Sequence, residues 1–360
     1  MKMMKNIVIV TLLGLAFQSC IKSIAVDTRT EKPILVVEGS ITTDTIPYRV
    51  RLTYSGPFTS TTDITDEQLE KDAIVTIEDD EGNATPMIYK DSGFYISTDP
   101  TYIGKVGRSY HVDILLKDGT RFISRPETIK PVPSIASVKG NFMMDFSIEL
   151  PTYMNVSIDA KDPAGEENYY QWKFYSLIAR QTLGVPCGFL CIKFEYCYQV
   201  HIDNEIRVLS DQNINGNEII NQTVGRAYIY TYINPYVEIA QHSISREAYQ
   251  FWTRYQDQLI RTGGILDPLP ASIKGNIYNA NDETDFALGY FSASSVFRKK
   301  IMIIPQGITE YLLDISARSH IPPGINSCFE YYPNALSYPD GRYPPPPPGW
   351  ENAEQIKVFW

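Results

Sequence analysis

The chain has 360 residues, 43% of them hydrophobic, which suffices for two or three domains with packed cores. Its formal net charge of −10 disfavours nucleic acid as a partner, because an acidic chain repels phosphate backbones. The 25 tyrosines indicate abundant β-strands, since aromatic residues favour pleated sheets; platforms for stacking sugars are the alternative use of these rings.

The first twenty residues predict export from the cytoplasm. Lys2 and Lys5 precede Ile7–Phe17, an uncharged and mostly apolar stretch that is too short to span a bilayer. A small residue directly before Cys20 resembles a bacterial lipobox, in which the cysteine is lipidated and becomes the first mature residue. We therefore expect a signal peptide over residues 1–19 and lipidation of Cys20, the alternative being an ordinary thiol beside a cleavage site. Cleavage would leave 341 residues and, with both lysines removed, a formal charge of −12.

Residues 20–32 predict a short lipid-anchored tether, after which the pattern is all-β. Alternating or continuous apolar segments predict strands at residues 34–41, 49–54, 73–78, 93–96, 110–116 and 121–124. Lys117–Thr120 predicts a hairpin turn between the last two. This spacing indicates an N-terminal Ig-like β-sandwich over residues 33–133.

Residues 134–342 predict a second β-rich domain, so the fold class is mainly β, with tandem Ig-like β-sandwiches and one helical insertion in the C-terminal domain. Its expected strands lie at residues 156–160, 169–175, twice within 189–208, and at 228–233, 287–291 and 300–304.

The helical insertion is predicted near residues 245–262. Ser243 or Ser245 can cap its start, and Glu247 in the first turn is favoured there by the helix dipole. One helical stripe predicts a face that packs on the core; it consists of Ala248, Trp252, Tyr255 and Leu259.

The C-terminal tail, residues 343–360, contains a proline run that favours polyproline II geometry. A partner's aromatic groove could bind it. We expect the tail to pack along the protein's own surface instead, because Trp350, Phe359 and Trp360 provide apolar anchors.

Lipidation of Cys20 would leave four cysteines, and an oxidising environment favours two disulfides among Cys187, Cys191, Cys197 and Cys328. If Cys191 and Cys197 share one strand they lie about 20 Å apart, too far for a bond. We favour pairing Cys187 with Cys191 and Cys197 with Cys328.

No familiar catalytic motif is present, so we expect a protein that is not an enzyme and that needs no cofactor or metal. Cys187, Cys191, Cys197 and His201 could hold zinc, but export favours oxidation of the thiols. Two acidic clusters, residues 79–81 and 282–285, offer oxygen ligands for calcium; without the spacing of a calcium loop, solvated turns are the favoured interpretation.

Several segments in order resemble a family of Bacteroidota lipoproteins catalogued as domain of unknown function 4249. They include Leu35–Ile41, Ala73–Asp79, Asn168–Trp172, Gly275–Asn279 and Leu288–Phe291. Members of that family look like outer-membrane lipoproteins encoded beside TonB-dependent receptors, so the resemblance implies an accessory role in envelope transport. The family's tail usually carries two nearby cysteines, whereas only Cys328 stands there in this chain.

We therefore expect a non-enzymatic binding or adaptor lipoprotein, anchored at the outer membrane on its periplasmic or surface face. Its expected partners are the membrane, through the lipid, and an outer-membrane β-barrel transporter, with a glycan or peptide as a further ligand class. The alternatives are an envelope glycan or peptide hydrolase, and an adhesin or fimbria-like subunit. Candidate binding loops are Thr59–Glu70 and Gly184–Cys197, since function concentrates in loops on rigid scaffolds.

Overall fold

The computed structural model of the protein describes residues 33–44, 47–56, 65–145, 152–181, 185–188, 191–193, 196–229, 234–261, 273–306, 336–338, 346–347 and 349–359. Strands dominate this part of the chain, accompanied by one α-helix, α2 (Arg246–Arg261), and a short 3-10 helix, η1 (Asp66–Gln68). Neither of these helices has the length and apolar character needed to cross a membrane.

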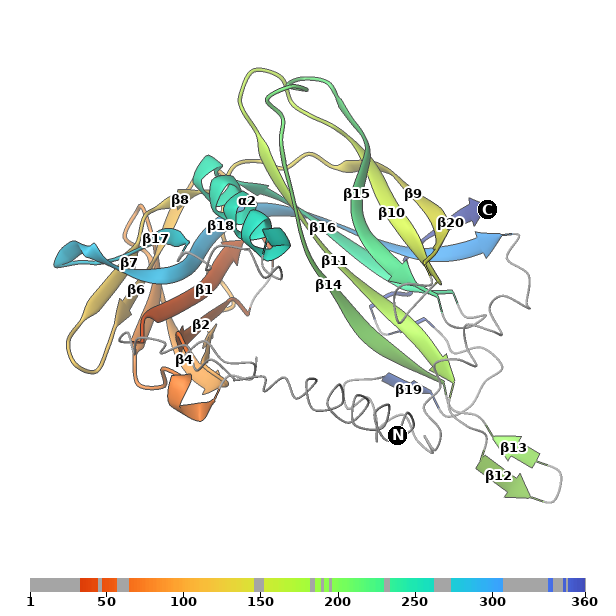
Figure 1. Ribbon diagram of the computed structural model, residues 1–360, viewed down its shortest axis with the longest axis horizontal. Helices are drawn as coiled ribbons and strands as arrows, with labels where there is room; N and C mark the ends of the chain where they lie inside the picture. The colour runs from red at the N-terminus through yellow and green to blue at the C-terminus, as the bar shows by residue number, and fades with distance from the viewer. Residues whose placement is uncertain are drawn as a thin grey trace, which may run out of the picture.

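The N-terminal strands form a closed barrel of nine strands, not the expected Ig-like sandwich (Figure 1). In order around the ring, they are β1 (Leu35–Thr42), β2 (Arg49–Tyr54), β5 (Phe94–Ser97), β4 (Ala84–Asp91), β3 (Ile74–Asp79), β6 (Ser109–Leu115), β7 (Arg121–Ser124), β17 (Lys274–Asn279) and β18 (Asp282–Gln306). The short β8 (Glu127–Thr128) also pairs with β6. The expectation of tandem sandwiches is wrong here because β17 and β18, from late in the chain, fill the gap between β7 and β1 and leave no open edge.

The ring closes where β18 pairs in parallel with β1, with Gly289 opposite Val37. Gly289 has a φ of +86°, and a Cβ atom there would lie 2.1 Å from the Val37 carbonyl oxygen. On the other side of the same residue, a Cβ on Gly275 would lie 1.6 Å from the Gly289 oxygen. Glycines therefore allow three backbones to meet at the closure.

The second region is a sandwich of two sheets, consistent with the expected β-rich domain. One sheet has β15 (Glu218–Tyr228), β10 (Thr152–Lys161) and β9 (Ile135–Met144). The larger has β19 (Leu336–Tyr338), β14 (Tyr196–Ser210), β11 (Tyr169–Gln181), β16 (Tyr236–Ile244), the second half of β18, and β20 (Glu354–Phe359). Their facing sides bury one apolar core that includes Val156, Trp172, Phe174, Ile239 and Ile301.

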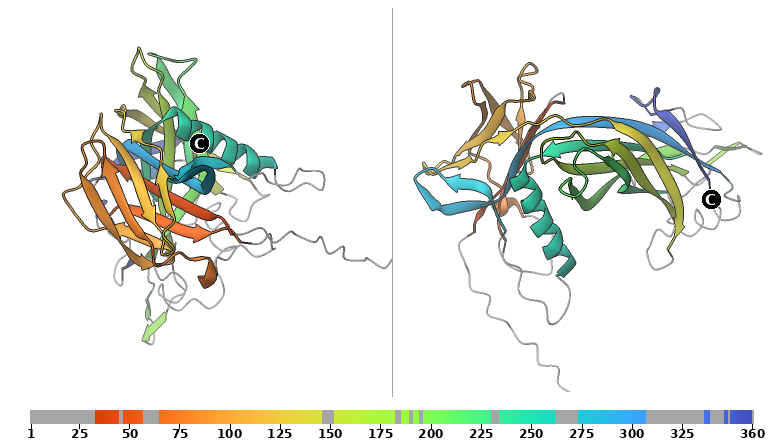
Figure 2. Two further views of the ribbon diagram at one scale, coloured as in Figure 1. Left: turned by 90° about the vertical axis from the view of Figure 1, so that its left-hand side faces the viewer. Right: turned by 90° about the horizontal axis from the view of Figure 1, so that it is seen from above.

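β18 joins the two regions, because this single strand of 25 residues pairs with β1 and β17 in the barrel and with β16 in the sandwich. Figure 2 shows it arching from one region into the other. The sequence predicts two separate strands here, at residues 287–291 and 300–304. Strands of residues 274–306 thus complete the sheet begun by residues 35–124, across the predicted boundary at residues 133–134.

Other strand predictions succeed where apolar and polar residues alternate plainly and fail where this alternation is absent or interrupted. The predicted strands at residues 49–54 and 121–124 match β2 and β7, and Gly119, with a φ of +89°, lies in the predicted hairpin turn. The prediction omits β4, β15 and β16. Of the strand predicted at residues 228–233, Tyr228 ends β15, and residues 230–233 lie outside the description.

The C-terminal tail packs on the protein's own surface, as predicted, through Trp350. This indole is buried against Leu177, Tyr198 and Tyr236, and β20 then runs parallel to β18.

Candidate functional site

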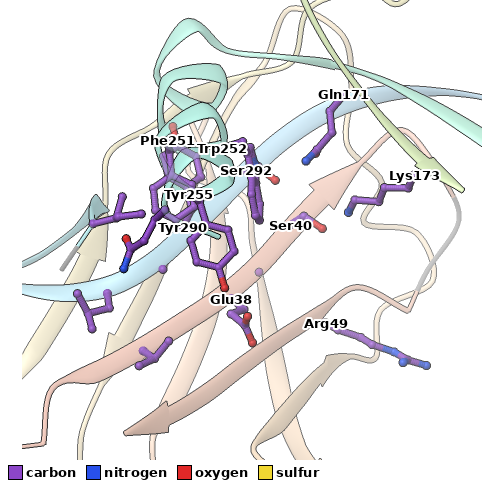
Figure 3. A pocket seen from close by; sticks show the side chains of 16 residues that line it. Glu38, Ser40, Arg49, Gln171, Lys173, Phe251, Trp252, Tyr255, Tyr290 and Ser292 are labelled. Atoms are coloured by element: carbon purple, nitrogen blue, oxygen red, sulfur yellow. The ribbon is translucent and has the colours of Figure 1, made fainter. Parts of the chain in front are cut away.

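A cleft lies between the barrel, the larger sheet of the sandwich and helix α2. It consists of two adjoining cavities of about 460 and 920 Å³. Both are lined by Ser40, Arg49, Gln171, Lys173 and Trp252. Figure 3 shows the smaller cavity, beneath α2, which we call the roofed cavity; the larger one, over the sheet, we call the open cavity. These volumes lie in the range of small-molecule sites.

The alternation of β11 supplies the floor of the cleft. Trp172 and Phe174 point into the sandwich core, where the Trp172 indole N–H donates to Gln241 Oε1 at 2.9 Å. The intervening Gln171 and Lys173 therefore emerge on the opposite face of the sheet, which lines the cleft. One strand thus serves both the core and the candidate site.

Helix α2 supplies the aromatic roof. Ser245 caps it as predicted, because its Oγ accepts a hydrogen bond from the Ala248 amide at 3.0 Å. Four rings gather in the roofed cavity: Phe251, Trp252 and Tyr255 from α2, and Tyr290 from β18. The Phe251 ring is parallel to the Tyr255 ring at 6.3 Å and lies 5.0 Å from the Tyr290 ring.

The predicted core-facing stripe is correct only for the first turns of α2. Ala248 is fully buried, whereas Tyr255 is 41% exposed and Leu259 is 53% exposed. The reason is geometric: α2 begins against the barrel and sandwich, and its C-terminal end projects beyond them (Figure 2). The exposed part of the stripe brings the Tyr255 ring to the cavity wall.

Several hydrogen-bonding groups of the cleft have no protein partner among the described residues. The Lys173 ammonium has neither an ion pair nor a hydrogen bond within this part of the chain, and the same holds for the Gln171 side-chain amide, although Gln171 is only 9% exposed. In Figure 3 both side chains extend from β11 toward the side of the cavity where Ser40 and the rings lie, while Arg49 extends away from the rings.

Two further buried nitrogens of the cleft lining lack partners in the described part of the protein. They are Nε1 of Trp252 and Nε2 of His242. The other His242 ring nitrogen, Nδ1, lies 2.9 Å from Ser294 Oγ. Buried polar groups are nearly always hydrogen-bonded, so this set of orphaned groups indicates a site built to contact something polar.

Among the described residues, the groups around the floor place no negative charge beside Lys173 and disfavour the charged forms of both Lys173 and His242. The Lys173 side chain opens onto the cleft but is crowded by protein, and this desolvation, with repulsion from Arg298, lowers its pKa. Burial holds the pKa of His242 far below its usual value, helped by the charges of Lys173 and Arg298, so this imidazole is neutral.

The carboxylates that line the open cavity, in contrast, are paired with arginines. Asp44 lies 2.5 Å from the Arg298 guanidinium. Arg298 also lies 2.5 Å from Glu238, which is outside the lining, and so ties the barrel to the sandwich. Asp203 and Glu205 pair with Arg207 at 3.0 and 2.6 Å. The negative groups of this cavity are therefore committed to structural ion pairs.

A separate cavity of about 680 Å³ exposes a buried carboxyl at the start of α2. Glu127 accepts hydrogen bonds from the Tyr290 hydroxyl and, at 3.4 Å, from Asn276 Nδ2. Burial raises the pKa of Glu127 to about 7; the charge of Glu247 adds to the shift, and hydrogen bonds from Ser245, Tyr290 and Asn276 oppose it. This group joins the barrel to α2 and is not part of the cleft.

The cysteines predicted to be lipidated or to form disulfides all have side chains that lie outside the described part of the chain. Cys20 and Cys328 lie outside the described residues. Cys187, Cys191 and Cys197 lie in β12 (Val185–Gly188), β13 (Cys191–Lys193) and β14, with side chains outside the description. Lipidation and both disulfides therefore remain predictions. Cys191 lies in β13 and Cys197 in β14, and residues 194–195 between these strands lie outside the description, so the spacing argument stays untested.

The residues considered as possible zinc or calcium ligands, His201 and the acidic cluster at residues 79–81, contact neighbouring side chains instead. His201 packs edge-on against Tyr228 at 4.9 Å. Arg108 pairs with Asp79, Asp80 and Glu81, so the first acidic cluster holds a guanidinium. Across the described residues, no three His, Cys, Asp or Glu side chains gather to hold a metal.

The predicted binding loops are not part of the cleft as described. Residues 59–64 lie outside the description, and Asp66–Gln68 forms η1 beside the barrel, capped by Thr65. Gly184 also lies outside the description, while β12 and β13 form a small hairpin. The cleft residues were missed because their signal, polar residues alternating with buried aromatics in Tyr169–Tyr175, is shared by any half-buried strand.

Comparison with known families gives one match. The family model described as "Domain of unknown function (DUF4249)" matches residues 21–300. No curated protein matches the chain.

Proposed function

Since the chain belongs to the DUF4249 family, whose function is unknown, we propose its role from the cleft: it is a non-enzymatic binding lipoprotein of the cell envelope. The observation that carries this proposal is the gathering of orphaned donors, Lys173 and Gln171, beside the exposed Tyr255 ring in a cavity of ligand size. Such a cavity, mostly preformed and with a few convergent polar groups, is the usual form of a binding site.

Binding is favoured over hydrolysis by the state of the acidic groups. A glycosidase needs two free carboxyl groups facing its substrate, one of them able to hold a proton. In the open cavity, Asp44 is held by Arg298, and Asp203 and Glu205 are held by Arg207. Among the described residues, the lining of the roofed cavity includes a single carboxylate, Glu38, whereas a glycosidase needs a pair. Glu127 does have a raised pKa, but it lines a different cavity.

The envelope location rests on the N-terminal sequence. Export followed by lipidation of Cys20 would anchor the protein at the outer membrane, on its periplasmic or surface face. The family resemblance implies a TonB-dependent transporter as its partner. We propose that the protein captures a ligand in the cleft and works beside that transporter.

Co-purification tests the adaptor role. The full chain is expressed in its native host with a C-terminal tag, solubilised in gentle detergent and recovered, beside a Cys20→Ala variant. The expected result is a stoichiometric outer-membrane transporter with the wild-type chain and a clear loss of it with the variant, which lacks the lipid. Recovery of the lipidated wild-type chain without any such partner would overturn the proposal.

A further inference from the structure

We propose that the cleft binds an acidic oligosaccharide, with the Lys173 ammonium pairing with a sugar carboxylate and the aromatic roof packing on the sugar rings. This inference deepens the proposed function and rests on the cleft as the binding site. It follows from the charge of the floor, the excess of donors, the exposed rings and the shape of the cleft.

The charge of the floor selects an anion. Lys173 is the cation that points into the cleft, and it has no carboxylate partner among the described residues. Of the carboxylates that line the two cavities, Asp44 is bound to Arg298, Asp203 and Glu205 to Arg207, and Glu38 lies 3.9 Å from Arg51. Because Lys173 has no ion pair in the described part of the chain, an incoming carboxylate would gain a charged hydrogen bond without displacing a protein partner.

The hydrogen-bonding groups select a ligand rich in acceptors. Besides Lys173, the lining offers the Gln171 amide and the Trp252 indole N–H, neither with a partner in the described part of the chain. Nε2 of His242, in the wall of the open cavity, can donate or accept depending on the tautomer. Sugar hydroxyls and ring oxygens suit such a mixed, donor-rich lining, whereas a fatty acyl chain would leave these groups unpaired.

The roof supplies the apolar surface that a sugar ring needs. Trp252 and Tyr255 come from one helix face, their ring centres 6.1 Å apart and nearly perpendicular. Tyr255 is 41% exposed, so a flat face remains for a ligand. The C–H face of a pyranose is apolar and packs on such rings, while its edge hydroxyls reach the polar floor.

The shape of the cleft indicates a chain of sugars, not a single one. Lys173, Gln171 and Trp252 line both cavities, so they lie at the junction between them. A charged unit held by Lys173 at this junction can place one neighbour under α2 and extend the other way into the open cavity of about 920 Å³.

The test is calorimetric titration of the purified full chain with tetragalacturonate, a hyaluronan tetrasaccharide and a sulfated chondroitin tetrasaccharide. The methyl ester of tetragalacturonate is the neutral probe, because it keeps the rings and linkages and removes the charge. We expect at least one acidic probe to bind, more weakly at high salt. The methyl ester should bind about tenfold to a hundredfold more weakly than its acid if that acid binds.

Two variants locate the site. Lys173→Met should weaken binding of the acidic probe by about tenfold to a hundredfold, since it removes a charged hydrogen bond. Tyr255→Ala should weaken acidic and neutral probes alike. Lys90→Met is the matched control, because Lys90 is exposed on β4 of the barrel and should leave binding unchanged. Thermal unfolding of each variant establishes that it is folded before titration.

Three outcomes would overturn the inference: no binding of any acidic probe, equal affinity for an acid and its methyl ester, or binding that Lys173→Met leaves unchanged. Each is separable from failure of the proposed function, because co-purification with a transporter is measured without any saccharide. If a transporter co-purifies but no acidic saccharide binds, only the inference about the ligand is refuted. If a saccharide binds but no transporter co-purifies, only the adaptor role is refuted.

Discussion

The barrel and the sandwich differ in whether the polar side chains considered below have partners within the described part of the protein. On the barrel, Arg108 is held by three acidic residues, and Arg121 pairs with Asp113, so these two charges are neutralised locally. On the outer face of the larger sandwich sheet, Lys173 and Gln171 have no partner among the described residues. A closed ring of strands buries its inner side and leaves no edge, which suits it as a rigid frame. The sandwich sheet has a second face, and this face carries the binding groups.

The comparison also teaches where the two regions depend on each other. They share β18, whose glycine closure completes the barrel, while the Glu127 cluster ties the barrel to α2 and the Arg298 clamp ties it to the sandwich. Substituting a residue in each of these features tests how much it contributes to the free energy of unfolding.

Breaking the barrel closure should have the largest effect. Gly289→Ala places a Cβ atom 2.1 Å from the Val37 oxygen at a φ of +86°, so we expect a loss of about 3–5 kcal/mol in the free energy of unfolding. Urea denaturation measures it. Gly119→Ala is the control: its φ is +89°, but nothing lies within 4 Å of the added atom, so only the backbone strain of about 1–2 kcal/mol applies. Equal effects of the two changes would contradict the role of the closure.

Removing the charge of Glu127 should alter how stability depends on pH. Its folded pKa of about 7 lies above the ordinary value of 4.5, so the folded state holds a proton that the unfolded state releases between these values. The stabilisation is fully present below pH 4.5 and is lost as pH rises through 7, by up to about 3 kcal/mol. Glu127→Gln should abolish this part of the slope, as measured by urea unfolding from pH 4 to pH 9.

The control for that measurement is Glu218→Gln, which changes an exposed carboxyl on β15 and should leave the slope as in the wild type. The three proteins share all their other titratable groups, so only the difference between their curves is interpreted. A Glu127→Gln curve parallel to the wild-type curve would refute the raised pKa.

Cutting the ionic clamp should have the smallest effect of the three. Arg298→Met leaves Asp44 and Glu238 without their shared guanidinium, although Lys300 still lies 3.7 Å from Glu238. We expect a loss of about 1–2 kcal/mol, below the cost of a fully buried pair because the Arg298 side chain is partly exposed. The matched control is Arg125→Met, which breaks an exposed pair and should change stability by less than about 0.5 kcal/mol. Loss of similar size in both would show that the clamp adds nothing.

Local chemistry made much of the secondary structure predictable. The alternation in Arg49–Tyr54 gives β2, the Asp-Gly sequence in Lys117–Thr120 gives a turn, and Ser245 caps α2. β16 was missed because both its faces are buried, so Tyr236–Ile244 shows no alternation of polar and apolar residues. β4 was missed because Pro86 interrupts it.

The candidate site was not predictable in the same way. Nothing in the neighbourhood of Lys173 along the chain distinguishes it from an ordinary lysine on a solvated strand face. It becomes notable only because α2, β1 and β2 enclose it from regions up to about 140 residues away in sequence. Likewise, Leu259 has the helical spacing of a core residue, yet α2 projects past the sheets at that point.

The sequence by itself determined that this protein is built of strands with one amphipathic helix, because periodicity and capping act over a few residues. Tertiary structure alone decided that β18 would close a barrel and then enter a sandwich, and that a lysine and an aromatic helix would meet across a cleft. Ring closure and cleft formation depend on contacts between distant segments, and no local pattern encodes which distant backbone will come within reach.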